Sequence, residues 1–205
     1  MEFKQVVEKR ASVRQFAPDP VSADALKEMV RLAGLAPSVN NAQPWKFVCV
    51  TNKELLKKMG EAVHDKLAVL VPPSGAAQNR NKVEWFSTFF ADAPAVIAIV
   101  ATDYAAVVDG VLPEGLTHAQ INEMRGHPDV QSLGGAVEHL LLAAVDLGLG
   151  ACWLSGPLVA REELEKLLGV GQNYTLGAMV AVGKPAGPAQ MKPKKPVEEI
   201  IEFRD

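Results

Sequence analysis

Several signatures that identify common classes of protein are missing from this sequence. The 205 residues include two cysteines, Cys49 and Cys152, which form no CxxC pair and no disulfide framework. There is no P-loop, no HExxH or comparable spacing among the four histidines, and no GxSxG frame around Ser155. These absences leave P-loop nucleotide hydrolysis, metalloenzyme chemistry and serine-hydrolase chemistry with little support.

The chain also lacks a large charge excess and a long apolar run. Its 21 basic and 24 acidic residues give a net charge of −3, which argues against a general nucleic-acid partner. The longest apolar stretch, residues 93–101, is about half a membrane span, and the N-terminal residues lack the apolar core of a signal peptide. Both cysteines lie in apolar runs, which predicts buried free thiols in a reducing compartment. We therefore expect a cytoplasmic protein that binds neither nucleic acid nor membrane.

Helical and strand patterns alternate along the chain and predict one α+β domain over residues 1–205. We expect helices at residues 3–10, 22–36, 135–147 and 161–168, and strands at 45–50, 95–101, 151–154 and 176–182. Ser22 can cap its helix, and Thr51 with Glu54 has the spacing of a capping box, so a further helix should follow Thr51. Residues 71–82 have the composition of a loop. Residues 103–131 have no clear pattern.

Two segments suggest contacts beyond a simple core. The helix at 135–147 is apolar nearly all round, so it is either buried or covered by a partner subunit. After residue 183 the chain carries Pro185, Pro188, Pro193 and Pro196, which predicts an extended C-terminal arm.

Basic residues near both chain ends form one candidate site. If the segment is extended, Arg10, Ser12 and Arg14 point to one side, and arginine forks match phosphate oxygens. Spacing alone favours a helix end with solvated arginines. Lys192 and Lys194 likewise share a side of an extended arm. Considered alone, this segment is better interpreted as a solvated basic tail. A bound phosphate dianion would bring the basic residues of both chain ends together.

Two further segments are rich in hydrogen-bonding groups. Residues 37–45 (PSVNNAQPW) place amide and hydroxyl side chains between two prolines. Pro44 should hold Gln43 extended. Carboxamide side chains can form hydrogen bonds with a heterocycle edge that carries alternating C=O and N–H groups. The alternative is a plain polar turn. Residues 153–157 (WLSGP) could be a turn that exposes backbone N–H groups, or an ordinary strand-to-helix connection.

Together these segments resemble the nitroreductase family of FMN-dependent oxidoreductases. The matching stretches are RASVRQF, APSVNNAQPWKFVCV, HLLLAAVDLGLGACWLSG, and VGKP followed by KPKKPVEEI, in the family's order and over nearly the whole chain. The resemblance implies an α+β fold with a central, mostly antiparallel sheet sandwiched by helices, and an extended C-terminal arm. It also implies an FMN cofactor and a homodimer with two flavins at its interface.

The resemblance assigns roles to the basic residues. Arg10, Ser12 and Arg14 would hold the FMN phosphate and ribityl chain and approach the N1–C2=O edge. Lys192 and Lys194 would complete the phosphate site.

The same resemblance assigns roles to the polar segments. Pro37, Ser38 and Val39 would lie against the flavin of a partner subunit, with Asn41 and Gln43 on its polar edge. A last backbone stretch would pass the flavin N5 and O4 atoms: Leu154, Ser155 and Gly156. Ser155 stands where some members carry a glutamate.

The implied activity is transfer of reducing equivalents from NAD(P)H to a nitroaromatic, a quinone or a flavin. The transfer would be a ping-pong hydride transfer through flavin N5, with no catalytic side chain and no metal. A specialised flavin reductase or dehalogenase of the same fold, a flavin-storage protein without turnover, and a cofactor-free helical dimerisation module are the alternatives. The last does not explain the arginine pair, the amide turn and the lysine pair together.

Overall fold

The computed structural model describes residues 1–71, 77–189 and 191–204. Its strands are β1 (Trp45–Val50), β2 (Ala95–Thr102), β3 (Gly150–Leu154) and β4 (Tyr174–Gly183). Its α-helices are α1 (Phe3–Lys9), α2 (Ala23–Ala33), α3 (Lys53–Leu70), α4 (Ala77–Thr88), α5 (His118–Met124), α6 (Pro128–Asp146) and α7 (Arg161–Leu168). Short 3-10 helices lie at Val39–Asn41, Phe89–Asp92, Val107–Val111, Gly156–Ala160 and Val197–Glu199.

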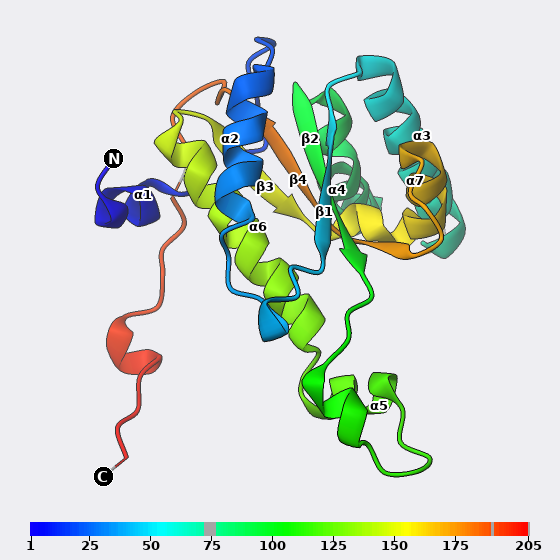
Figure 1. Ribbon diagram of the computed structural model, residues 1–205. Coiled ribbons are helices and arrows are strands. Elements are labelled where there is room, and N and C mark those ends of the chain that lie inside the picture. The colour runs from blue at the N-terminus through cyan, green and yellow to red at the C-terminus, as the bar shows by residue number, and fades with distance from the viewer. Residues whose placement is uncertain (72–76, 190, 205) are drawn as a thin grey trace.

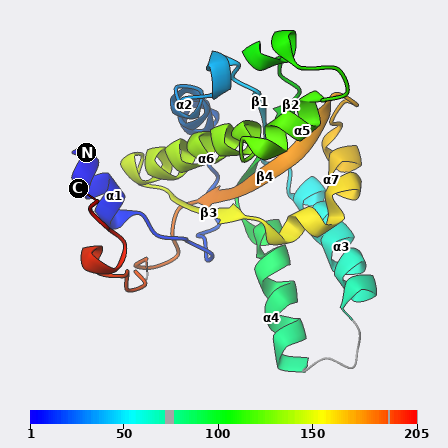
Figure 2. The same ribbon diagram turned by 90° about the horizontal axis from the view of Figure 1, so that it is seen from below.

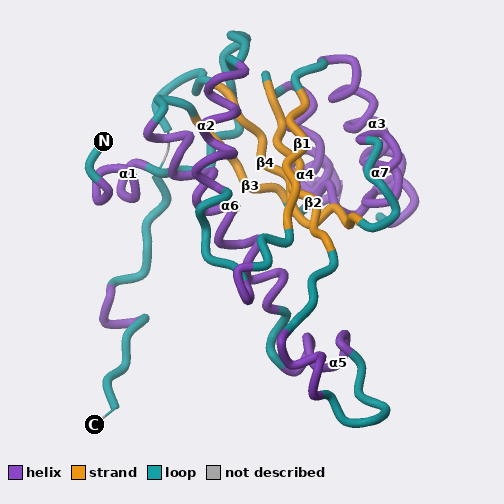
Figure 3. Tube along the Cα trace, in the orientation of Figure 1, coloured by secondary structure: helices purple, strands orange, loops and turns teal. Residues whose placement is uncertain are grey.

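The strands form one sheet in the order β1-β2-β4-β3, and each neighbouring pair is antiparallel. Helices cover both faces of this sheet (Figures 1 and 3). The predicted α+β architecture, a mostly antiparallel sheet sandwiched by helices, is confirmed. Because β3 forms an edge of the sheet, its outer side is available to the chain segment that carries the arginines.

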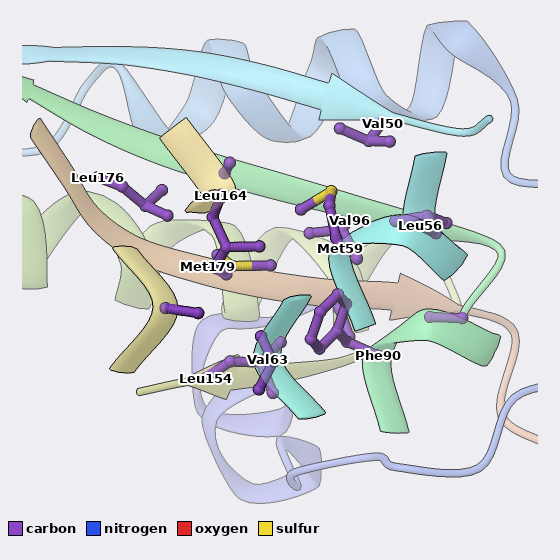
Figure 4. Packing of buried hydrophobic residues seen from close by; sticks show 14 of the residues in the cluster. Val50, Leu56, Met59, Val63, Phe90, Val96, Leu154, Leu164, Leu176 and Met179 are labelled. Atoms are coloured by element: carbon purple, nitrogen blue, oxygen red, sulfur yellow. The ribbon is translucent and has the colours of Figure 1, made fainter. Parts of the chain in front are cut away.

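The alternation of side chains along β2 divides the interior into two hydrophobic cores. Val96, Ala98 and Val100 face one core, where Met59 of α3 and Leu164 of α7 are fully buried (Figure 4). The intervening residues of β2 face the other core, which α2 and α6 cover. Every residue from 95 to 100 is buried, as the continuous apolar run predicts.

Most predicted elements are present with similar bounds. β1 and α7 have the predicted limits. The hydroxyl of Ser22 accepts a hydrogen bond from the Ala25 N–H and so caps α2. Helix α6 begins at Pro128, seven residues before its prediction, because a proline at the first helical position needs no N–H partner.

Two predictions about the region after β1 are wrong. The cap of α3 is Asn52, whose side chain accepts the Leu55 N–H, and not Thr51. The predicted loop at 71–82 is helical from Ala77 onward, where α4 begins, while residues 72–76 lie outside the described part of the chain. In Figure 2, α4 projects from the sheet on the side where the 10–16 segment runs.

The C-terminal arm is extended and exposed over its described residues, apart from the 3-10 turn at Val197–Glu199. It leaves the body of the molecule beyond β4 (Figure 1). No helix in the described ranges has the length and apolar character required to span a bilayer.

Candidate functional site

The segment that carries the arginines is extended because β3 holds it. Helix α1 ends at Lys9, and Arg10 already has extended backbone angles (φ −61°, ψ 122°). Ser12 forms a parallel bridge with Ala151 of β3, and the Val13 N–H donates to the Ala151 carbonyl at 3.0 Å. The segment is therefore extended beyond Arg10, which is the C-terminal cap of α1.

The chain beyond β4 holds the same segment from its other side. The Ala17 N–H donates to the Lys184 carbonyl at 2.8 Å, and the Ala186 N–H donates to the Gln15 carbonyl at 3.0 Å. Gly150 permits the close approach, because a Cβ atom there would lie 2.7 Å from the Val13 side chain. Backbone hydrogen bonds thus place the N-terminal segment beside the start of the C-terminal arm.

A small cavity of about 80 Å³ lies where the two ends meet, and we call it the basic pocket. Its lining comes only from the two chain ends: Arg10, Ala11, Ser12, Arg14, Met191, Lys192 and Lys194. The predicted Arg10, Ser12, Arg14, Lys192 and Lys194 are therefore brought together, across about 180 residues of sequence. Four cationic side chains and a hydroxyl line one concave surface.

The charge of the basic pocket is uncompensated by protein carboxylates. Across residues 1–71, 77–189 and 191–204, no ion pair includes Arg10, Arg14, Lys192 or Lys194. One hydrogen bond fixes Arg14, whose Nη1 donates to the Ser12 carbonyl at 3.2 Å. Arginine and lysine present only donors, so the pocket can bind a phosphate or another oxyanion.

A larger cavity of about 440 Å³ adjoins the basic pocket, and we call it the tail groove. The two cavities share Ser12, Arg14, Met191 and Lys192. The remaining lining of the tail groove is Val13, Gln15, Trp85, Gly187, Pro188, Ala189 and Pro193. Trp85 of α4 is absent from the sequence-based site, since no motif surrounds it. In the sequence, the two adjacent aromatic residues Trp85 and Phe86 were the available sign of a binding surface.

The amide turn at residues 37–43 has an unusual backbone. Asn40, Asn41 and Gln43 all have positive φ angles, of 51°, 54° and 49°. The prediction that Pro44 holds Gln43 extended is therefore wrong. Instead, the Gln43 N–H donates to Ser38 Oγ at 3.0 Å, and the Gln43 carbonyl accepts the Trp45 N–H at 2.7 Å. Such strain in non-glycine residues often accompanies a binding function.

Ser132 of α6 ties the amide turn to the fold. This serine is buried; its Oγ accepts the Val39 N–H at 3.0 Å and donates to the Pro128 carbonyl at 2.6 Å. None of the predicted residues of the turn lines the basic pocket or the tail groove of the same chain: Pro37, Ser38, Val39, Asn41 and Gln43. One chain therefore does not join the turn to the cations.

The predicted residues after β3 lie at its C-terminal end. Leu154 is buried in the core, Ser155 is exposed, and Gly156 begins a 3-10 helix. A Cβ atom on Gly156 would lie 2.6 Å from Ser87 Oγ, so glycine lets the end of α4 approach this turn. These residues also line neither cavity.

The two thiols differ from each other. Cys152 is buried beneath the arginine segment, and burial raises its pKa while Arg14, Ser12 and Arg10 act in the opposite direction. Cys49 is exposed as a residue, which contradicts its predicted burial, although partial covering of the thiol raises its pKa. A raised pKa favours the protonated form of each thiol, which is a weaker nucleophile than the thiolate.

The chain thus has an α+β fold and a pocket that is lined by cationic side chains from both chain ends. The chain belongs to the nitroreductase family, whose model matches residues 7–184. This finding confirms the family that the sequence motifs indicate.

Three similar proteins place the chain within that family. A BluB-like flavoprotein from Clostridium difficile 630 is 32% identical, with a TM-score of 0.89 and complete coverage of both chains. A protein of Archaeoglobus fulgidus, provisionally named NADH dehydrogenase/NAD(P)H nitroreductase, is 28% identical over 90% of this chain and 86% of its own. An iodotyrosine deiodinase structure bound to FMN and 3-iodo-L-tyrosine shares the fold, with 23% identity, 98% coverage of each chain and a TM-score of 0.74. FMN, the predicted cofactor, is thus present in a structural neighbour.

Proposed function

We propose that this chain is an FMN-dependent oxidoreductase whose basic pocket holds the cofactor phosphate. The observation that carries the proposal is the convergence of Arg10, Arg14, Lys192 and Lys194 on one cavity, without an ion-pair partner in the described ranges. The donor set fits FMN, because a phosphate dianion accepts the charge-assisted hydrogen bonds that four cations and the Ser12 hydroxyl can donate. The adjoining tail groove leaves room for a ligand larger than phosphate.

Bound FMN would supply the redox chemistry, passing reducing equivalents from NAD(P)H to an organic acceptor such as a nitroaromatic, a quinone or a flavin in a ping-pong cycle. The protein residues need only bind and orient. Arg14, held by the Ser12 carbonyl, would stabilise the negative charge that a flavin gains on reduction. The backbone at Leu154, Ser155 and Gly156 would pass the reactive edge. NAD(P)H as the donor is favoured by the named activity of the Archaeoglobus relative.

The complete site would require a homodimer. The amide turn, with Pro37, Ser38, Val39, Asn41 and Gln43, does not face the cations of its own chain, so a partner subunit would bring it to them. An apolar groove of about 360 Å³ between α1, α2 and α6 offers a surface for a second copy. Leu35, at its rim, is 66% exposed. The C-terminal arm would cross the partner, and residues 1–205 would form a single cytoplasmic domain.

A reductive dehalogenase is the second candidate, because the iodotyrosine deiodinase structure shares the fold over nearly the whole chain. It would use the same FMN site and differ in the acceptor. Residues 103–131, which contain α5 (His118–Met124), would then have to supply the groups that recognise a halogenated phenol. A flavin-storage protein without turnover remains the alternative to both enzymes.

The deciding experiment is the absorption spectrum of the purified protein, with mass identification of any released chromophore. We expect flavin bands and the mass of FMN, or FMN binding on titration if the protein is colourless. Anaerobic NADH or NADPH should then bleach the flavin bands, and a nitroaromatic, a quinone and 3-iodo-L-tyrosine should be compared as acceptors. Failure to bind FMN would refute the proposal, whereas FMN binding without reduction would support storage.

A further inference from the structure

The guanidinium of Arg14 lies against an aromatic ring that belongs to neither end of the chain. Its Cζ atom is 5.3 Å from the centroid of the Phe86 ring. Phe86 is in the last turn of α4 and is 38% exposed. A cation at this distance from an aromatic face is attracted by the ring quadrupole. Arg14 therefore has two restraints, the Phe86 ring and the Ser12 carbonyl.

An aromatic ring and a carboxylate differ in how much of the charge and hydrogen-bonding capacity of Arg14 they leave available. Arginine has five N–H donors, and in the described part of the chain Arg14 uses one of them, on the Ser12 carbonyl. A carboxylate partner would occupy further donors and neutralise the positive charge. An aromatic face orients the guanidinium while its charge and its remaining donors stay free for a ligand.

Phe86 is itself held by a series of aromatic contacts that starts in the core. Trp85 meets Phe86 edge-to-face, with ring centroids 4.8 Å apart, and stacks on Phe89 at 5.6 Å. Phe89 is buried against α3 and belongs to the core of Figure 4. The last turn of α4 also approaches the turn after β3 closely, because Gly156 leaves room for Ser87. The position of the Phe86 ring is thus set by the body of the protein.

We propose that Phe86 is the positioning residue of Arg14, and that it holds the guanidinium toward bound FMN while leaving its charge uncompensated. The proposal rests on the proposed function, in which Arg14 faces the cofactor. It assigns a role to α4, which contributes no residue to the site predicted from the sequence. Trp85 and Phe89 act as supports of the ring.

A double-mutant cycle tests this role. Phe86→Leu removes the ring quadrupole and retains an apolar side chain, Phe86→Tyr retains the ring, and Arg14→Gln removes the cation. For each variant and for Arg14→Gln/Phe86→Leu, the dissociation constant of FMN and the midpoint potential of the bound flavin are measured, and circular dichroism verifies folding. We expect Phe86→Leu to weaken FMN binding about two- to fivefold and to make the midpoint potential more negative. Phe86→Tyr should retain the wild-type values.

The cycle separates action through Arg14 from a general structural effect. If Phe86 acts through Arg14, Phe86→Leu has no further effect on affinity or potential when residue 14 is glutamine. An equal effect in both backgrounds, or a potential unchanged by Phe86→Leu, would overturn the proposal. If Phe86→Leu fails to fold, Phe86→Met, with its flexible side chain, takes its place in the same cycle. A wild-type protein that binds no FMN would refute the proposed function instead.

Discussion

Two polar regions of this molecule are built in opposite ways. The basic pocket gathers four cations, and no carboxylate in the described part of the chain forms an ion pair with them. The α5 lobe, residues 103–127, projects beyond the start of α6 (Figure 1), and its polar groups pair with one another and with Asp129 in the first turn of α6. The Tyr104 hydroxyl donates to Asn122 Oδ1 at 2.7 Å, and Asn122 Nδ2 donates to Asp129 Oδ1 at 2.8 Å. His118 Nδ1 is 2.8 Å from both carboxylate oxygens of Asp109.

The comparison distinguishes a ligand site from a structural network. Buried or clustered polar groups need partners, and like charges brought together repel. In the lobe these partners are supplied by the protein, so the hydrogen-bonded network stabilises the segment. In the basic pocket they are not, so an anion from outside would relieve the repulsion. Each of the following predictions tests one side of this difference.

The largest expected effect follows from removing half the pocket charge. Lys192→Ala combined with Lys194→Ala should weaken FMN binding about 100-fold, because two charge-assisted hydrogen bonds to phosphate are lost. The measurement is a fluorescence titration with FMN at two salt concentrations. The salt dependence of binding should also become weaker.

The matched control is Lys57→Ala combined with Lys58→Ala, which removes two exposed lysines of α3 and the same net charge. This variant should retain wild-type affinity. An equal loss of affinity in both double variants would show that net charge, and not the basic pocket, determines binding.

The second prediction concerns the contact that positions the arginine segment. Gly150→Ala would place a methyl group 2.7 Å from Val13, so the segment must move away from β3. We expect a loss of about 1–3 kcal/mol in the free energy of unfolding and weaker FMN binding, measured by urea denaturation and titration. Gly110→Ala is the control in the lobe, where an added Cβ meets nothing within 4 Å. If FMN affinity survives Gly150→Ala, the contact with β3 does not position Arg10, Ser12 and Arg14.

The sequence predicted the strands of the sheet from local signals, whereas the basic pocket depends on contacts between distant segments. The strand at residues 45–50 and the helix at 161–168 have a clear pattern of apolar residues and clear boundary residues, such as Pro44 before the strand and Gly169 after the helix. The spacing of Arg10, Ser12 and Arg14 showed which residues would share a side if extended, but the bridge to β3 joins Ser12 to Ala151, 139 residues later in the chain. Only the resemblance to a family supplied that information.

The missed features depend on contacts that periodicity does not contain. Helix α4 has a polar first half, and its packing comes from Ser87 in its last turn and from Phe89 and Phe90 just beyond it. Gln43 avoids the extended conformation because Ser38 Oγ accepts its N–H. Cys49 lies on an edge strand, so an apolar run did not ensure its burial. The Gln43 conformation is set by a contact within its own turn, and the other two outcomes depend on the tertiary structure.

The third prediction concerns the hydrogen bond between Ser132 and Val39, which supports the amide turn; Ser132 lines neither the basic pocket nor the tail groove. Ser132→Ala leaves the Val39 N–H and the Pro128 carbonyl without their buried partner. We expect a loss of about 1–2 kcal/mol in the free energy of unfolding, measured by chemical denaturation. If a partner subunit brings this turn to the flavin, FMN affinity should fall as well, even though Ser132 lines no cavity. An unchanged affinity in a folded, destabilised variant would place the turn away from the cofactor.

The smallest expected effect lies in the lobe and should leave the pocket unaffected. The hydrogen bond from His118 holds the pKa of Asp109 below its usual value, and the Ala106 N–H, which donates to Asp109 Oδ2 at 2.7 Å, acts in the same direction against the cost of burial. Because the folded-state pKa is lowered, the carboxylate stabilises the lobe above the unfolded pKa of about 3.9. This contribution is lost as the pH falls through the folded pKa.

Amide hydrogen exchange at Ala106 should therefore show protection at pH 6 that decreases in acid, whereas Asp109→Asn should show weaker protection at pH 6 and little change on acidification. FMN affinity at neutral pH should be the same in both proteins, since the Asp109 side chain does not line the basic pocket. A loss of FMN affinity in Asp109→Asn would mean that the lobe takes part in binding, and the distinction between the two regions would then be wrong.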